Sequence, residues 1–356
     1  MLIIASDHRV GRRIDTYLAR GKGLPMKGRQ RNWRYGGPLA LVAALPFCFP
    51  LVAAEVDPAL RLNPEKEDSS IEFSRRDTIK VDVEMALINV TVTDPTGRMV
   101  TGLDKDHFLV KEDNKMQVVE QFGAEEAPLS LAVVFDASGS MGYKMSKARE
   151  AVAQFFKTVN PEDEFFLVQF NNRPEMVTGF TDSLEEIQSR LTFVRSKGRT
   201  ALLDAIYLAL SQMKQAKNSQ KAVLVISDGG DNSSRYTPRE IKRTVRESDV
   251  QIYAIGIYEP FSSRGRTPEE AAGPGLLTEI AEATGGRQFA VQNVNELPDI
   301  AEKIGIELRN QYILGYVPEN TQKDGKWRRV RVEIKRIRGM PELRAYYRNG
   351  YYAPTR

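Results

Sequence analysis

The chain has 356 residues, of which 41% are hydrophobic and 28% are charged. This composition suits two modest globular domains and excludes wholesale disorder. The formal net charge of +4 originates in residues 1–54, which hold nine Lys and Arg against two Asp and Glu. Beyond them the chain is close to neutral, which argues against general nucleic-acid binding.

The amino-terminal residues have the features of an export signal. The basic stretch Lys27–Arg34 precedes an apolar run over 38–54 that ends in small residues. This order is typical of a signal peptide. We expect residues 1–54 to be a signal peptide or an uncleaved anchor, and the protein to be exported to the periplasm, the cell envelope or the exterior. Cys48 is the only cysteine, so the mature chain would have neither disulfides nor thiolate metal ligands.

Two segments with different patterns follow the signal. Residues 55–78 are polar and charged, with two prolines, and predict a flexible linker. Over 79–126 the pattern changes to short alternating strands, at 79–85 and 87–93, with a hairpin over 110–118. These strands are too few to close a hydrophobic core by themselves.

The middle of the chain, 127–311, alternates strands with helices. This alternation predicts a doubly wound, mostly parallel sheet of the Rossmann-like α/β class. We also expect an exposed loop over 264–273. We expect strands at 131–136, 164–170, 175–180 (an antiparallel edge), 222–227, 251–258 and 288–291, and helices at 146–159, 184–194, 201–213, 238–248, 275–284 and 296–309.

The carboxyl-terminal residues 312–356 return to a strand pattern, with strands expected at 312–317, 327–337 and 343–352. Neither this segment nor 79–126 can bury a core alone, and the termini of the middle domain should lie close together. We therefore predict that the two segments pair and form one small β-sandwich, built from residues before and after the α/β domain.

The last residues are basic: 323–356 hold eleven Lys and Arg against three Asp and Glu. Within this segment Val330, Val332 and Ile334 alternate with charged residues. The alternation favours a strand with one charged face in solvent. The alternative is a basic stripe that contacts an anionic surface of the cell envelope.

Oxygen-bearing side chains gather where predicted strands end. Asp136, Ser138 and Ser140 follow the first strand of the α/β domain, and Asp228 follows another. Ligands bind at this edge in open α/β sheets. Together with Thr200, in a loop before a helix, these side chains form an all-oxygen set that suits Mg²⁺. For the first loop taken alone, a turn that caps the next helix remains an alternative.

These three segments resemble the metal-ion-dependent adhesion site of von Willebrand factor type A domains, and the resemblance spans roughly residues 128–311. It implies that the hydroxyls bind the metal directly, that the aspartates bind it directly or through water, and that one position stays open for a partner's carboxylate. Arg199 departs from the Gly common at its position. The residues that the resemblance assigns to the metal (Mg²⁺, or Mn²⁺ or Ca²⁺), here named the five predicted ligands, are Asp136, Ser138, Ser140, Thr200 and Asp228.

The layout of strands around an α/β domain also resembles a bacterial subgroup of these domains that is abundant in acidobacteria. Members of that subgroup share the Asp-Ala-Ser-Gly-Ser-Met sequence and a terminal Gly-Tyr-Tyr-Ala, which stands here at Gly350–Ala353. The resemblance implies an exported adhesion or protein-binding module that captures a Glu or Asp side chain of a partner protein. It implies no catalytic activity.

Nearby polar residues allow less specific interpretations. Asp231, Asn232 and Ser233 either support the metal ligands or form a turn, and the turn is favoured. Asp204 begins a predicted helix, where a carboxylate suits the helix amino end. Its expected role is structural.

Two other classes of function stay open. Ser140 partly imitates the nucleophile of a serine hydrolase, but no histidine follows His107, so the usual triad cannot form. His107 is expected to be a surface or packing residue, because zinc chemistry needs more His or Cys than the chain has. The third class is a structural envelope protein whose metal only holds loops together. The sequence does not predict an oligomeric state.

Overall fold

The computed structural model describes residues 85–124, 127–258 and 268–355, and the side chains of 268–271 are not described. The expected signal peptide (1–54), the linker (55–78) and all but the last residue of the strand at 79–85 lie outside these residues. Every helix and strand given below lies within them.

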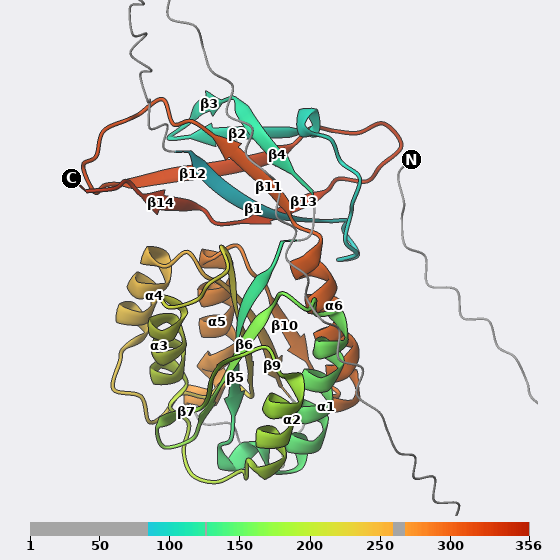
Figure 1. Cartoon of the computed structure of the whole chain (residues 1–356), viewed down its shortest axis with the longest axis vertical. Helices are drawn as coiled ribbons and strands as arrows, with labels where there is room; N and C mark the ends of the chain where they lie inside the picture. The colour runs from blue at the N-terminus through green and yellow to red at the C-terminus, as the bar shows by residue number, and fades with distance from the viewer. Residues whose placement is uncertain (1–84, 125–126, 259–267, 356) are drawn as a thin grey trace, which may run out of the picture. The chain divides into compact units, whose positions relative to one another are not determined.

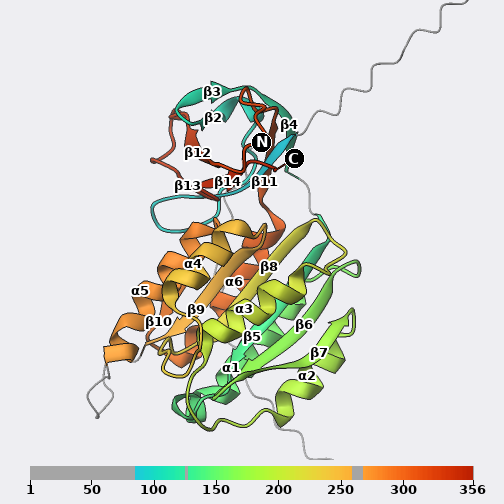
Figure 2. The same cartoon turned by 90° about the vertical axis from the view of Figure 1, so that its left-hand side faces the viewer.

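The central element of the described residues is a six-stranded sheet with the order β10-β9-β8-β5-β6-β7 (Figures 1 and 2). All neighbouring pairs are parallel except β6 and β7, which are antiparallel as predicted for the edge. Strands covered on both faces read as near-continuous apolar runs, and every residue of β5 and β9 is buried. The strands are β5 (Leu129–Asp136), β6 (Glu164–Phe170), β7 (Pro174–Thr181), β8 (Gln220–Ser227), β9 (Gln251–Ile257) and β10 (Gln288–Val291).

Helices cover both faces of this sheet (Figure 2). Alternate residues of a strand point to opposite faces, so Val133 of β5 packs with α1, α2 and α6, whereas Val134 packs with α3, α4 and α5. The described helices are α1 (Met145–Phe155), α2 (Leu184–Phe193), α3 (Leu202–Met213), α4 (Pro238–Glu247), α5 (Pro268–Ala283) and α6 (Leu297–Arg309). None of them is both long and apolar enough to span a bilayer.

Two further four-stranded sheets, with the orders β13-β1-β11-β4 and β14-β12-β2-β3 in the described residues, are antiparallel throughout. Each combines strands from before and after the α/β domain, and one apolar cluster lies between them. Figure 1 shows this mixture as blue-green strands beside red ones. The strands are β1 (Ala86–Thr93), β2 (Phe108–Glu112), β3 (Lys115–Gln117), β4 (Val119–Gly123), β11 (Tyr312–Tyr316), β12 (Trp327–Ile334), β13 (Arg344–Tyr347) and β14 (Gly350–Tyr352).

The predicted fold class is therefore confirmed: a doubly wound α/β domain with antiparallel sheets built from the segments on either side of it. In β12 the valines Val330 and Val332 are buried, whereas Arg329 and Arg331 are exposed, as the alternation predicts. One pair crosses the charged face, because the Lys111 ammonium bonds both carboxylate oxygens of Glu333 at 3.0 Å.

Two elements differ from the prediction. The strand expected over 343–352 is divided into β13 and β14, which belong to different sheets. The chain changes sheets between them, where the Asn349 carbonyl accepts a hydrogen bond from the Val330 amide at 2.9 Å. An apolar pattern reports which residues are buried, and it does not report which sheet buries them.

The helix expected over 275–284 begins earlier, at Pro268, and so includes part of the loop expected over 264–273. The helix passes through both Gly273 and Pro274. Gly273 is needed for close packing, because a Cβ at this position would collide with the carbonyl oxygen of Gly229.

Buried polar groups that bond to one another lie at the amino edge of the central sheet, where β11 leaves α6. Arg309 forms an ion pair with Asp163, and Asp163 also accepts a hydrogen bond from the Leu129 amide at 2.8 Å. Gln311 donates to the Thr91 hydroxyl at 3.1 Å. The bond between Gln311 and Thr91 links the α/β domain to β1 of the sandwich.

Candidate metal centre

The five predicted ligands come from three loops at the opposite, carboxyl edge of the sheet. Strand β5 lies between β6 and β8 and is parallel to both, so the strand order reverses beside it. Such a switch point opens a crevice outside the strand ends in α/β folds. Asp136 is the last residue of β5, and Asp228 directly follows β8.

Asp136 is fully buried and held from two sides. One carboxylate oxygen accepts a hydrogen bond from the Ser138 amide at 2.8 Å, and the other accepts one from the Ser227 hydroxyl at 2.6 Å. Burial, and then the negative charge of Asp228, raise the pKa of Asp136 to about 7.

The two serines of the first loop lie side by side, with their hydroxyl oxygens 3.0 Å apart. Ser138 is buried and begins a short 3-10 helix over Gly139–Lys144, but its side chain makes no capping hydrogen bond. The alternative of a side-chain-capped helix is therefore not what this loop adopts. Both hydroxyl oxygens keep lone pairs for another ligand.

Thr200 is buried, and its backbone is fixed by the loop that follows β8. Its amide donates to the side-chain oxygen of Asn232 at 2.9 Å, and its carbonyl accepts from the Asn232 amide at 3.0 Å. No described residue bonds to the Thr200 hydroxyl. The first and second loops are also joined directly, because the Gly139 amide donates to the Gly198 carbonyl at 3.0 Å.

Asp228 has a partner that the sequence did not predict. The Lys144 ammonium lies 3.0 Å from its carboxylate, and both side chains are only 9% exposed. Lys144 ends the 3-10 helix that follows the two serines, so an internal cation stands directly behind a predicted metal ligand. The two residues lie 84 positions apart, so no local pattern in the sequence indicates the pairing.

Two further supporting residues were missed or left open. The sequence pattern places Ser227 only at the end of a strand, whereas its hydroxyl orients Asp136. The sequence favours a turn at Asn232, whereas its side chain positions Thr200. The expectation for Asp204 agrees with the structure: its carboxylate is buried and accepts hydrogen bonds from the Arg235 and Tyr236 amides at 2.8 and 3.1 Å.

Arg199, which stands where glycine is common, is exposed and makes two hydrogen bonds. Its guanidinium donates to the Asn232 carbonyl at 2.7 Å, and its amide donates to the Asn172 side chain at 2.8 Å. The neighbouring Gly198 has φ of 81°, and a Cβ there would lie 2.7 Å from the Asn172 side-chain oxygen. Glycine is therefore needed at 198, whereas the arginine at 199 is accommodated.

The donor set fits a hard divalent cation. It combines two carboxylates with three hydroxyls and has no nitrogen or sulfur donor, the composition that suits Mg²⁺. No group of three or more His, Cys, Asp and Glu side chains with metal-binding geometry occurs among the described residues. The centre is therefore rich in hydroxyls rather than in carboxylates.

Comparison with known proteins agrees with this geometry. Residues 130–303 match the von Willebrand factor type A domain. This chain contains a von Willebrand factor type A domain. Domains of this family typically mediate metal-dependent protein interactions, commonly bind a divalent metal, and occur in proteins that are generally not enzymes.

Relatives share the von Willebrand factor type A region at low identity. Inter-alpha-trypsin inhibitor heavy chain H4 from Bos taurus is 24% identical over 198 residues, which are 52% of this chain and 20% of that protein. An uncharacterized protein from Borreliella burgdorferi is 25% identical over 218 residues, which are 52% of this chain and 64% of that protein. The chain thus spans about one fifth of the length of the first relative.

Solved structures also resemble the chain. A von Willebrand factor type A protein from Catenulispora acidiphila has a TM-score of 0.45 at 14% identity, covering 76% of this chain and 72% of that one. Proximal thread matrix protein 1 from the mussel byssus, described with a zinc-occupied adhesion motif, has a TM-score of 0.43 at 22% identity. That likeness covers 54% of this chain and 48% of the mussel protein.

Proposed function

We propose that the five predicted ligands together hold one divalent cation, Mg²⁺ or a related ion such as Mn²⁺ or Ca²⁺, and that the domain thereby captures a Glu or Asp side chain of a partner protein. The observation that carries this proposal is the pair of serine hydroxyls, 3.0 Å apart and free of any capping role, beside a fully buried aspartate. Hydroxyls left without a structural task at a sheet's switch point are what a ligand site requires.

Each side chain has a defined part. Asp136 is aligned by Ser227 and contributes negative charge from within the protein. Ser138 and Ser140 are neutral donors, so they would leave most of a cation's charge uncompensated. A bound divalent cation would therefore act as a strong acceptor for an incoming carboxylate, more so at a partly dehydrated surface.

Calorimetric titration of the mature chain with Mg²⁺ and Mn²⁺ tests the metal proposal. Ser140→Ala should weaken metal binding by about tenfold or more, because it removes a direct oxygen ligand. Ser146→Ala is the matched control, since Ser146 is exposed at the start of α1. Equal metal affinity in the parent and in Ser140→Ala would overturn the assignment.

The same variants separate the alternatives. A structural envelope protein would bind the metal but capture no partner, so retention of envelope proteins on the immobilised chain would not depend on chelator. For the hydrolase alternative, the one described hydrogen-bond partner of the Ser140 hydroxyl is the Ser138 hydroxyl, which is not a base. Covalent labelling of Ser140 by a serine-reactive probe would revive that alternative.

We also propose that the protein is exported, on the strength of the basic and apolar segments within residues 1–54. Expression of the full chain in a bacterial host should yield a mature form outside the cytoplasm. Amino-terminal sequencing of that form would locate any cleavage. Recovery of the whole chain from the cytoplasm, with its amino terminus intact, would contradict export.

A further inference from the structure

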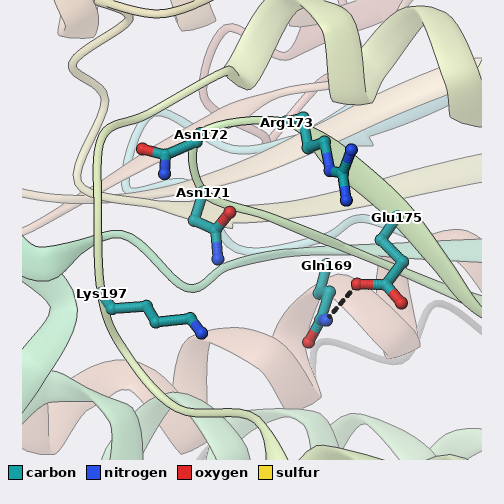
Figure 3. A pocket seen from close by; sticks show the side chains of 6 residues that line it. All are labelled: Gln169, Asn171, Asn172, Arg173, Glu175 and Lys197. Carbon is teal, nitrogen blue, oxygen red and sulfur yellow. Dashed lines mark hydrogen bonds between the residues drawn. The ribbon is translucent and has the colours of Figure 1, made fainter.

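A groove lies beside the metal centre, where β6 ends and β7 begins. It consists of two adjoining pockets of about 410 and 380 Å³, and Gln169, Asn171 and Lys197 line both. Figure 3 shows the first pocket, with Lys197 reaching in from one side, Arg173 on the other and Asn171 between them.

The groove shares its walls with the loops that carry the predicted ligands. The Lys197 amide donates at 2.8 Å to the carbonyl of Ala137, the residue directly before Ser138. On the other side, the amide of Ala201, the residue directly after Thr200, donates to the Asn171 carbonyl at 2.8 Å. A partner segment that reaches the metal centre would therefore also meet the groove.

The groove is positively charged. The cations that line it are Arg173, Arg190, Arg195 and Lys197, all of them exposed, and none forms an ion pair with a residue that the structure describes. Among the described residues of the lining the single carboxylate is Glu175, which accepts a hydrogen bond from the Gln169 side chain at 2.9 Å. Unpaired cations gathered along a concave surface attract an anionic partner.

An apolar side chain lies at the end of the same groove. Phe193, the last residue of α2, is 78% exposed and lines the second pocket together with Val177. Exposed aromatic residues beside charged ones are typical of protein-binding surfaces, where they act as anchors. An anionic polysaccharide would make little use of this apolar end.

We propose that this basic groove, defined by Arg173, Arg190, Arg195 and Lys197, binds an acidic peptide segment of the partner protein. Its carboxylates pair with the groove cations, one neighbouring carboxylate serves the metal centre, and an apolar side chain of the segment contacts Phe193. The binding of one carboxylate at the metal centre rests on the proposed function. Binding of the peptide in the groove rests on the charge and shape of the groove, so either statement can be refuted without the other.

The test uses fluorescence anisotropy of a labelled peptide, Glu-Glu-Leu-Glu-Asp-Phe-Glu-Glu, added to the mature chain with Mg²⁺. The double variant Arg173→Gln/Lys197→Gln should weaken the peptide complex about five- to tenfold and flatten its salt dependence, as expected for two lost surface ion pairs. Its Mg²⁺ affinity, measured by calorimetry, should stay within about twofold of the parent. Phe193→Ser should weaken binding without changing the salt dependence.

The control is Arg336→Gln/Arg338→Gln, which removes the same charge from two exposed residues of the sandwich. It should bind the peptide like the parent. The proposal is wrong if both double variants bind alike, or if polygalacturonate competes better than the unlabelled peptide. If Ser140→Ala still binds the peptide, and Arg173→Gln/Lys197→Gln does so more weakly, the groove proposal stands. Only the metal-mediated capture of the partner would then be contradicted.

Discussion

The two edges of the central sheet use polar side chains in opposite ways. At the amino edge, Asp163 and Arg309 are buried and satisfy one another. At the carboxyl edge, the hydroxyls of Ser138, Ser140 and Thr200 are spared from capping or backbone bonds. The polar groups at the amino edge stabilise the fold by bonding to each other, whereas the hydroxyl oxygens at the carboxyl edge can still bind a ligand.

This comparison predicts opposite effects of substitution. Changes at the amino edge should lower the free energy of unfolding and leave metal affinity intact in the molecules that remain folded. Changes to the predicted ligands at the carboxyl edge should lower metal affinity with little loss of stability, whereas removal of the Lys144 cation beside them should do the reverse. The four substitutions below are ordered from the largest expected effect to the smallest.

Asp163→Ala should cause the largest loss of stability. It leaves the Arg309 guanidinium buried without a counter-charge and removes the acceptor for the Leu129 amide. Breaking one side of a buried ion pair costs about 3–5 kcal/mol. Urea denaturation measures this loss, with the exposed Asp182→Ala as the control. A loss no larger than that of the control would contradict the account of the amino edge.

Asp136→Asn should abolish most metal binding while sparing the fold. It removes a charged ligand, so Mg²⁺ affinity should fall by about 100-fold or more, beyond what residues behind the ligands usually contribute. Stability without metal should stay equal or rise, because burial and Asp228 both disfavour the charged form of Asp136.

The matched variant for that experiment is Asp204→Asn, which changes another buried aspartate of the same domain. Asp204 accepts backbone hydrogen bonds and is not a predicted ligand. It should lower stability and leave metal affinity unchanged. If Asp204→Asn lowered metal affinity and Asp136→Asn lowered only stability, the roles given to these two aspartates would be refuted.

Lys144→Met should raise metal affinity and lower stability. The ammonium competes with a divalent cation for the Asp228 carboxylate, so its removal should strengthen Mg²⁺ binding about tenfold, or 1.4 kcal/mol. Without metal, the unpaired carboxylate should cost about 1–3 kcal/mol. Calorimetry and thermal melting with and without Mg²⁺ measure both effects.

Lys147→Met tests the same charge loss at an exposed ion pair with Glu150 and should change neither quantity by much. If Lys144→Met instead weakens metal binding, Lys144 supports the ligands rather than competing with the cation.

Thr200→Val should have the smallest effect, confined to the metal. The substitution preserves shape and removes a hydroxyl to which no described residue bonds, so stability should change by about 0.5 kcal/mol or less. Metal affinity should fall several-fold. Thr192→Val, on the exposed face of α2, should alter neither. A large loss of stability at Thr200 would show that its hydroxyl has a structural role.

Local patterns predicted the fold well wherever burial follows a strict period. The apolar run of β5, for example, is visible in the sequence, and all its residues are buried. The division of 343–352 into two strands was not visible, because the two strands share one alternating pattern and differ only in their partners.

The same limit applies at the metal centre. The five predicted ligands remain a prediction that rests on motifs, although the structure brings their loops together. The pairing of Lys144 with Asp228 joins residues 84 positions apart and follows no local rule. The basic groove likewise combines Arg173 with Lys197, from separate loops, and neither loop marks it alone.

Anomalous diffraction from crystals of the mature chain soaked in Mn²⁺ is the most direct test of the central proposal. We predict one strong manganese peak at the carboxyl edge of the sheet, within bonding distance of the Ser138 and Ser140 hydroxyls and near Asp136, Thr200 and Asp228. A peak bound elsewhere, or an ordered crystal at saturating Mn²⁺ with no peak at these residues, would contradict it.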